Sequence, residues 1–181
     1  MKVILHFANG FEEVEAITPV DVLRRAGIDV VTVSVTGKKE VISKGGVTIM
    51  TDKLMEEVDY FTADAIILPG GQPGADNLSK HEGLRKQIQV FHKNSKLIAA
   101  ICAAPLVLGA AGILKGKRVT CFPGVELKLI GATITGNLVE EDGNIITGKG
   151  PGAAMKFSLA VVEKLVGKNK ADDIKKAMIV E

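Results

Sequence analysis

Residues Lys96 to Pro105, with the sequence KLIAAICAAP, contain the features that decide the fold of this chain. The apolar run from Leu97 to Ile101 is typical of a buried parallel strand. It stops at Cys102 without a turn residue, and a second apolar run, Leu106 to Ala111, follows closely and predicts a helix. A strand, a nucleophilic side chain and a helix in this order are the layout of a nucleophile elbow, in which a sharp turn lifts the nucleophile clear of the sheet.

Two interpretations of Cys102 are open at this point. Pro105 suits the first turn of a helix, and a thiol at the positive end of a helix dipole has a lowered pKa, which favours the reactive thiolate. Alternatively, Cys102 is a structural cysteine at the end of a strand, because free cysteine is among the most buried residue types. The local sequence supports both interpretations equally.

The size and composition of the chain exclude several classes of partner. We expect residues 1–181 to form one domain, because this length suffices for a sizeable core. Aromatic residues make up 4% without any Trp, and the net charge of +2 comes from lysines scattered among glutamates, so neither nucleic acid nor a membrane surface is expected as the main partner. Two cysteines form no disulfide framework, and we find no signal or membrane-spanning segment, so we expect a cytoplasmic protein.

Strand and helix patterns alternate along the chain, which predicts an α/β fold with a single doubly wound, mostly parallel sheet sandwiched by helices. We expect strands at residues 3–8, 30–35, 63–68, 97–101, 117–123, 132–134, 138–139 and 145–146, and a small hairpin at 41–50. We expect helices at residues 12–25, 81–93, 106–111, 125–130, 153–165 and 170–178, and a helical turn at 54–58. The helix at 12–25 has apolar residues at helical spacing, namely Val14, Ile17, Val20 and Leu23.

In such sheets, sites form where loops leave the carboxyl ends of strands. Four loops contain suitable residues: 9–15, 69–71, 102–103 and 121–123. The glycines after Pro69 do not have the G-x-G-x-x-G spacing, and the later Gly-rich loop lacks the Ser or Thr of a P-loop, so nucleotide binding is disfavoured. Instead, the Gly71 N–H could face the Cys102 thiol and help to form an oxyanion hole with the Ala103 N–H.

Three glutamates, Glu12, Glu13 and Glu15, follow the first predicted strand. Neighbours on a helix point about 100° apart, so at most one or two of them can face Cys102. A carboxyl beside a buried thiolate would have a raised pKa, could stay protonated and could donate a hydrogen bond to the sulfur. Alternatively, all three complement the helix dipole, and for three acids at once the residues alone favour this second interpretation.

The three histidines, His6, His81 and His92, have no acidic or cysteine neighbour at the spacing of metal ligands. We therefore expect no metal and no cofactor. No Cys–His dyad is evident either. His6 is interpreted as a core residue, and the other two as solvated residues at the ends of one helix.

Five motifs occur in order along the chain: NGFEEVE at 9–15, PVDVLRRAG at 19–27, LPGG at 68–71, AAICAAP at 99–105 and GPG at 150–152. Together they resemble the ThiJ/PfpI superfamily nearly end to end, and most closely its branch with the human Parkinsonism-associated deglycase and bacterial YajL. The resemblance implies a flavodoxin-like sandwich, related to class I glutamine amidotransferase domains, that forms a homodimer.

The resemblance also implies roles for individual residues. Cys102 matches the nucleophilic, oxidation-prone cysteine of the family, and Glu15 matches the protonated glutamate that hydrogen-bonds it. Gly71 and Ala103 match the backbone N–H positions around the sulfur. Further residues are expected around the pocket, namely Gly70, Cys121, Phe122, Gly150 and Pro151, and two at the dimer contact or pocket rim, Arg25 and Lys44, of which Lys44 replaces an arginine.

Two departures from the family pattern bear on the chemistry. The human-type branch has a histidine where this chain has Phe122, and the protease-like PfpI branch has a histidine directly after the nucleophile, where this chain has Ala103. The second difference weighs against peptidase activity. Cys121 is interpreted either as a packed structural cysteine, the usual role of a buried one, or as a second redox thiol.

The resemblance therefore leads to three functional hypotheses. The first is a cofactor-free cysteine hydrolase or lyase that acts on methylglyoxal, glyoxal or their early adducts on amines and thiols, with Cys102 as nucleophile and Glu15 as proton shuttle. The second is a redox-sensing stress chaperone that acts through oxidation of Cys102. The third and weakest is an intracellular peptidase or amidase.

Overall fold

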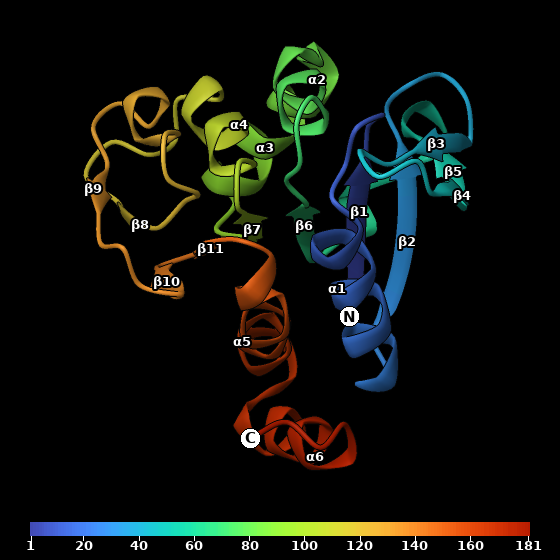
Figure 1. The fold of residues 1–181 in the computed structure, drawn as a ribbon, viewed down its shortest axis with the longest axis vertical. Coiled ribbons are helices and arrows are strands. Elements are labelled where there is room, and N and C mark those ends of the chain that lie inside the picture. Colours follow the sequence, from blue (N-terminus) through green and yellow to red (C-terminus); the bar gives the residue numbers. More distant parts are fainter.

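A seven-stranded sheet forms the centre of the computed structural model, which describes residues 1–181 (Figure 1). All neighbouring strands in this sheet run parallel to each other, except for one antiparallel pair at an edge of the sheet. The predicted α/β fold with a mostly parallel sheet is confirmed. In order across the sheet, the strands are β10 (Val139–Asp142), β11 (Ile145–Gly148), β7 (Leu97–Ile101), β6 (Ala65–Leu68), β1 (Lys2–Phe7), β2 (Asp29–Ser34) and β5 (Lys53–Leu54).

Helices cover both faces of the sheet, so the central strands are enclosed (Figure 1). On one face, α1 (Glu13–Arg25) packs against α5 (Ala154–Val166), and α6 (Lys168–Ala177) packs on α5. On the other face, three helices contact one another, namely α2 (Gly74–Lys80), α3 (Glu82–Lys93) and α4 (Pro105–Ala110). No helix has both the length and the apolar character needed to cross a membrane.

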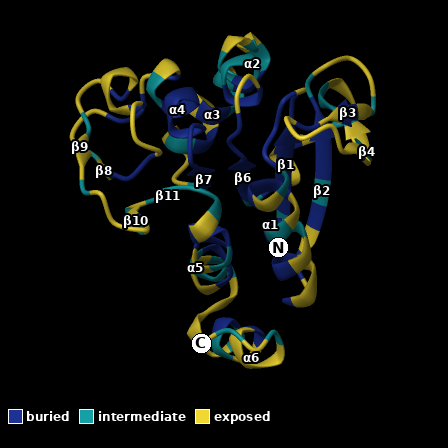
Figure 2. Ribbon diagram, viewed as in Figure 1, coloured by how far each residue is buried: buried dark blue, intermediate teal, exposed yellow.

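The central strands β6 and β7 are fully buried. Exposed residues gather on the outer faces of the helices and on the loops and short strands at the two sides of the sheet (Figure 2). Helix α1 departs from the expected pattern. Two residues of its apolar series, Val14 and Ile17, are 49% and 43% exposed, and Glu15 is completely buried instead. The helix therefore brings a carboxyl group into the core and leaves apolar side chains at the surface.

The prediction of a strand over residues 117–123 is wrong for most of this segment. Only Arg118–Val119 forms a strand, β8, which pairs in parallel with β9 (Thr133–Ile134) outside the main sheet. Beyond β8, the Thr120 N–H donates to the hydroxyl of Thr147 (2.9 Å) rather than to a backbone carbonyl, so the ladder does not continue. Cys121 and Phe122 therefore belong to the segment that contains β8 and β9, residues 117–137, which we call the side lobe. They do not lie at the end of a strand of the main sheet.

Most of the other elements agree with the sequence patterns, but the helix expected at residues 125–130 is only a 3-10 turn, Glu126–Lys128. The small hairpin off the main sheet is present as β3 (Glu40–Ile42) and β4 (Thr48–Met50). The two-residue edge strand β5, the 3-10 turn Tyr60–Thr62 and helix α2 are not predicted. Helix α2 begins at Gly74, directly after Pro73, and a Pro–Gly pair by itself indicates a turn.

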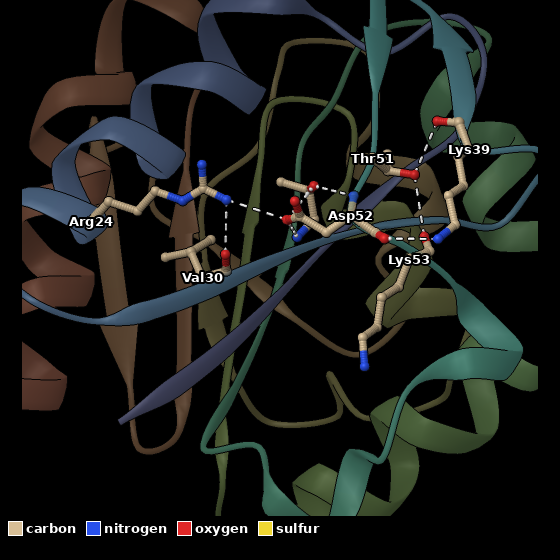
Figure 3. A network of polar contacts seen from close by, with 7 residues as sticks. Arg24, Val30, Lys39, Thr51, Asp52 and Lys53 are labelled. Atoms are coloured by element: carbon tan, nitrogen blue, oxygen red, sulfur yellow. Dashed lines mark hydrogen bonds and ion pairs between the residues drawn. The ribbon is translucent and has the colours of Figure 1, made fainter.

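A polar network joins the last turn of α1 to the edge of the sheet (Figure 3). The Asp52 carboxylate accepts hydrogen bonds from the N–H and the hydroxyl of Thr32 (2.9 and 2.8 Å) and from the Arg24 guanidinium (3.2 Å). Arg24 also donates to the carbonyl of Val30 (3.0 Å), and the Lys39 ammonium donates to the carbonyl of Asp52 (3.0 Å). These bonds hold the C-terminal end of α1, whereas Glu15 lies in the first turn of the helix.

Candidate active site

Cys102 occupies a strained backbone turn between β7 and α4. Its φ of 65° lies in the left-handed region of backbone conformation, which residues other than glycine rarely adopt. Two backbone hydrogen bonds hold the turn, one from the Cys102 N–H to the carbonyl of Gly148 (2.8 Å) and one from the Phe122 N–H to the carbonyl of Cys102 (2.8 Å). Strain of this kind persists only where the surroundings fix it, and it clusters at functional sites.

Two backbone N–H groups face the sulfur of Cys102, those of Gly71 and Ala103. Gly71 has a φ of +87°, and a Cβ there would lie 2.4 Å from the nitrogen of Glu12. Only glycine fits this position, because the loop after β6 passes directly over the start of α1. The two N–H groups predicted around the thiol are thus brought together by separate strand ends.

The three glutamates at the start of α1 have three different partners. The Glu12 carboxylate caps the helix by accepting the N–H of Glu15 (2.8 Å). The Glu13 carboxylate accepts the hydroxyl of Ser43 and the N–H of Gly45 (3.0 Å), which ties the hairpin loop to the helix. Only Glu15 is completely buried, so the helix-dipole interpretation does not account for all three acids.

The Glu15 carboxyl lies beside Cys102 and is inaccessible to solvent. One of its oxygens, Oε2, accepts the N–H of Gly70 (3.0 Å). Burial is the main cause that raises the pKa of Glu15 to about 7, because a charged carboxylate is poorly solvated there. The nearby charge of Glu12 raises this pKa further, whereas hydrogen bonding to Cys102 and Gly70 and the charge of Lys44 lower it.

The pKa of the Cys102 thiol is raised to about 12, which is opposite to the direction expected from a helix dipole. Burial contributes most, followed by the negative charge of Glu15 and the hydrogen bond to it, and these effects exceed the lowering by the N–H groups of Gly71 and Ala103. Helix α4 has only six residues, so its dipole is small. From neutral to moderately alkaline pH, the pair of Glu15 and Cys102 therefore shares one proton and one negative charge.

The predicted rim residues Lys44 and Arg25 lie in different places. Lys44 is exposed on the hairpin loop, and its charge lowers the pKa of both Glu13 and Glu15. Arg25 lies ten residues after Glu15, roughly 15 Å away along the helix, and pairs with Asp21 (2.9 Å). The structure does not bring Arg25 to Cys102.

A hollow of about 280 Å³ lies beside the elbow, and three predicted pocket residues, Phe122, Gly150 and Pro151, line it. The prediction did not include the other lining residues, Pro123, Leu138, Lys149, Gly152 and Ala153. Leu138 in particular has no local motif that marks it. The side chain of Cys121 is buried and is not part of the lining, and burial raises the pKa of its thiol to about 11.

The histidines lie outside this site. His6 is buried in β1, its Nε2 is 2.6 Å from the Tyr60 hydroxyl, and burial lowers its pKa to about 3. His81 caps α3 by accepting the N–H of Leu84 on Nδ1 (3.1 Å).

A model of the DJ-1/PfpI family matches residues 1–164. The chain belongs to the DJ-1/PfpI family.

Several relatives match nearly the whole chain. The Parkinson disease protein 7 homolog of Danio rerio is 37% identical over 184 residues, which cover 99% of this chain and 97% of that protein. Protein DJ-1 homolog B of Arabidopsis thaliana is 39% identical over 99% of this chain, but the chain spans only 41% of the length of that relative. A Caenorhabditis elegans relative with the name glutathione-independent glyoxalase DJR-1.2 is 36% identical over 170 residues, covering 92% of this chain and 89% of that protein.

The fold is also that of solved DJ-1 structures. Oxidized DJ-1 of Toxoplasma gondii has a TM-score of 0.94 with this chain at 35% identity, and the match covers 98% of this chain and 97% of the other. The mostly parallel, helix-flanked sheet described above is therefore the DJ-1 fold.

The site leaves no room for a side chain at Gly70. A Cβ there would lie 2.5 Å from Oε2 of Glu15 and 2.7 Å from Cβ of Cys102. We expect Gly70→Ala to displace the pair, to lower the free energy of unfolding by about 1–3 kcal/mol, and to slow alkylation of Cys102 by iodoacetamide at pH 8. Urea unfolding and intact mass measure the two effects.

Gly152→Ala is the matched control, because a Cβ at Gly152 meets no atom within 4 Å and the backbone is not left-handed. Equal stability and equal alkylation rates in the two variants would contradict the close packing around the pair.

Proposed function

We propose that the chain is a cofactor-free, cysteine-dependent enzyme that converts methylglyoxal or glyoxal, free or as early adducts on amines and thiols, into 2-hydroxy acids. The observation that carries this proposal is the Glu15 carboxyl buried beside Cys102, because it supplies a proton acceptor and donor next to a nucleophile. The relative with the name glutathione-independent glyoxalase supports this reaction class.

The first step is addition of the thiol to the aldehyde. The Glu15 carboxylate takes the proton of Cys102 while the sulfur forms a bond to the aldehyde carbon, and the carbonyl electron pair moves to the oxygen. The N–H groups of Gly71 and Ala103 face this region and stabilise the oxyanion. Protonated Glu15 then returns the proton to that oxygen, which gives a hemithioacetal.

The second step moves hydrogen between the two substrate carbons. The Glu15 carboxylate removes the hydrogen of the former aldehyde carbon and delivers it to the ketone carbon, while a proton moves between the two oxygens. The aldehyde carbon is oxidised by two electrons and the ketone carbon is reduced by two, so no external oxidant is needed. Water then cleaves the resulting thioester of Cys102 and releases lactate and the free thiol.

A second candidate function is redox sensing through Cys102, with a stress-chaperone role. It is supported by the match to an oxidized DJ-1 structure and by the position of Glu15, whose protonated carboxyl can donate to an oxygen on the sulfur. The two functions use the same thiol and can coexist.

We also propose that the protein is a cytoplasmic homodimer that forms through α1. The half-exposed Val14 and Ile17 lie on this helix, next to residues that hold the site. Apolar side chains that converge on one surface are typical of interfaces between copies.

The enzymatic proposal predicts lactate release from methylglyoxal by the wild type. Cys102→Ala should lose at least about a thousandfold in kcat/KM, because the nucleophile is absent. Glu15→Gln should lose about a hundredfold or more, because the amide cannot shuttle protons. Lactate is quantified by chromatography, and Cys121→Ala, which removes the other buried thiol, should stay within about threefold of the wild type. Equal rates in the wild type and Cys102→Ala would refute the mechanism.

The redox proposal predicts that mild peroxide adds two oxygens, about 32 Da, to Cys102 before Cys121 is modified. Intact mass and peptide mapping follow the product, and Glu15→Gln should accumulate less of this sulfinate because it lacks the acidic hydrogen. If oxidation of the five methionines or of Cys121 precedes that of Cys102, the sensor role is wrong.

A further inference from the structure

The hollow beside the elbow is tied to the Cys102 backbone from two directions. The Phe122 N–H donates to the carbonyl of Cys102 (2.8 Å), and Phe122 and Pro123 form one wall of the hollow. The Cys102 N–H donates to Gly148 (2.8 Å), and the residues that directly follow Gly148 form the second wall. Two walls of the hollow are therefore attached to the backbone of the residue that carries the candidate nucleophile.

A third wall is joined to the second. The Lys149 N–H donates to the carbonyl of Leu138 (2.9 Å), which places Leu138 in the lining. The Lys149 ammonium donates to the carbonyl of Gly136 (3.0 Å), which places the end of this side chain against residue 136.

The lining presents mainly apolar surface. The Phe122 ring lies over Gly150, where a Cβ would be 3.3 Å from Cδ2 of the ring, and Pro151 continues this surface. Phe122 and Leu138 are 47% and 53% exposed. Single exposed apolar residues are common, but these converge on one concave surface that an apolar group could cover.

The volume fits a group of the size of a phenyl ring. An apolar cavity of about 150 Å³ accepts benzene, and this more open hollow has about 280 Å³. The methyl group of methylglyoxal would cover only a small part of it, and glyoxal has no substituent at all.

We propose that this hollow is the substituent subsite of the enzyme, and that Phe122 and Leu138 select 2-oxoaldehydes with an aryl or bulky alkyl group over methylglyoxal and glyoxal. The inference rests on the proposed function, because it assigns the substituent of a substrate whose carbonyl Cys102 attacks. Apolar contacts of this kind change kcat/KM by about tenfold or more for each well-buried group.

The first test compares kcat/KM for phenylglyoxal and methylglyoxal, with mandelate and lactate as products. We expect the wild type to prefer phenylglyoxal by at least about tenfold. Phe122→Ala and Leu138→Ala should each reduce this preference severalfold. Phe61→Ala is the matched control, because Phe61 is 89% exposed and its ring contacts Lys96 instead of the hollow. A preference that is absent, or unchanged in both hollow variants, overturns the inference.

The second test does not need turnover. Phenacyl bromide and bromoacetone alkylate thiols through the same bromomethyl ketone and differ only in phenyl against methyl. The quantity measured is the rate of alkylation of Cys102 by phenacyl bromide divided by the rate with bromoacetone, and it is normalised by the same ratio for glutathione. We expect this normalised ratio to be about ten in the wild type and close to one in Phe122→Ala. Peptide mapping confirms that the label is on Cys102 and not on Cys121.

The two tests separate the inference from the proposed function. Cys102-dependent turnover of both aldehydes with rate ratios that do not depend on Phe122 would overturn the subsite and leave the enzyme proposal standing. A Phe122-dependent alkylation ratio without any turnover would support the subsite and overturn the enzyme proposal.

Discussion

The burial of the Glu15 carboxyl beside the Cys102 sulfur is the constraint on which the rest of the site depends. A buried carboxylate next to a thiolate would place two negative charges in a poorly solvated space, so the pair shares a proton instead. Accommodating the pair requires glycine at positions 70 and 71, since any larger residue would displace Glu15 or the start of α1. Helix α1, which carries Glu15, is held by hydrogen bonds at both ends, by the cap at Glu12 and by the Arg24–Asp52 network.

The elbow supplies the second half of this arrangement. Strand β7 is completely buried, so its end cannot shift, and the bonds to Gly148 and Phe122 hold Cys102 in a left-handed turn. The same two bonds position the hollow lined by Phe122 and Leu138. The pair of Glu15 and Cys102 and the proposed substituent subsite are therefore linked through the backbone of Cys102.

Much of this fold could be predicted from the sequence, because strong local patterns determine it. The apolar run before Cys102 and the glycines after β6 indicated a buried strand and a loop without side chains. Sequence alone could not select Glu15 among three acids, since the partners of Glu13 and Glu15 lie far away in the chain, at Ser43 and Gly70 respectively. It also gave the wrong direction for the pKa of Cys102, because dipole arguments are local whereas burial depends on the complete fold. The segment around Phe122 was misassigned since its hydrogen-bond partners come from other elements.

The most direct test of the central constraint is the pH dependence of stability in the wild type and in Glu15→Gln. Glu15 has a raised pKa in the folded protein, about 7 against an ordinary value of 4.5, so folding favours the protonated form. Its contribution to stability is present at pH values below the ordinary pKa of 4.5 and is lost as the pH rises through the folded pKa of about 7. The wild type should therefore lose roughly 3 kcal/mol relative to the variant between pH 4 and pH 8 in urea unfolding, and the two curves should become parallel only about one unit above the folded pKa. Parallel curves throughout pH 4–8 would contradict a buried, proton-sharing carboxyl.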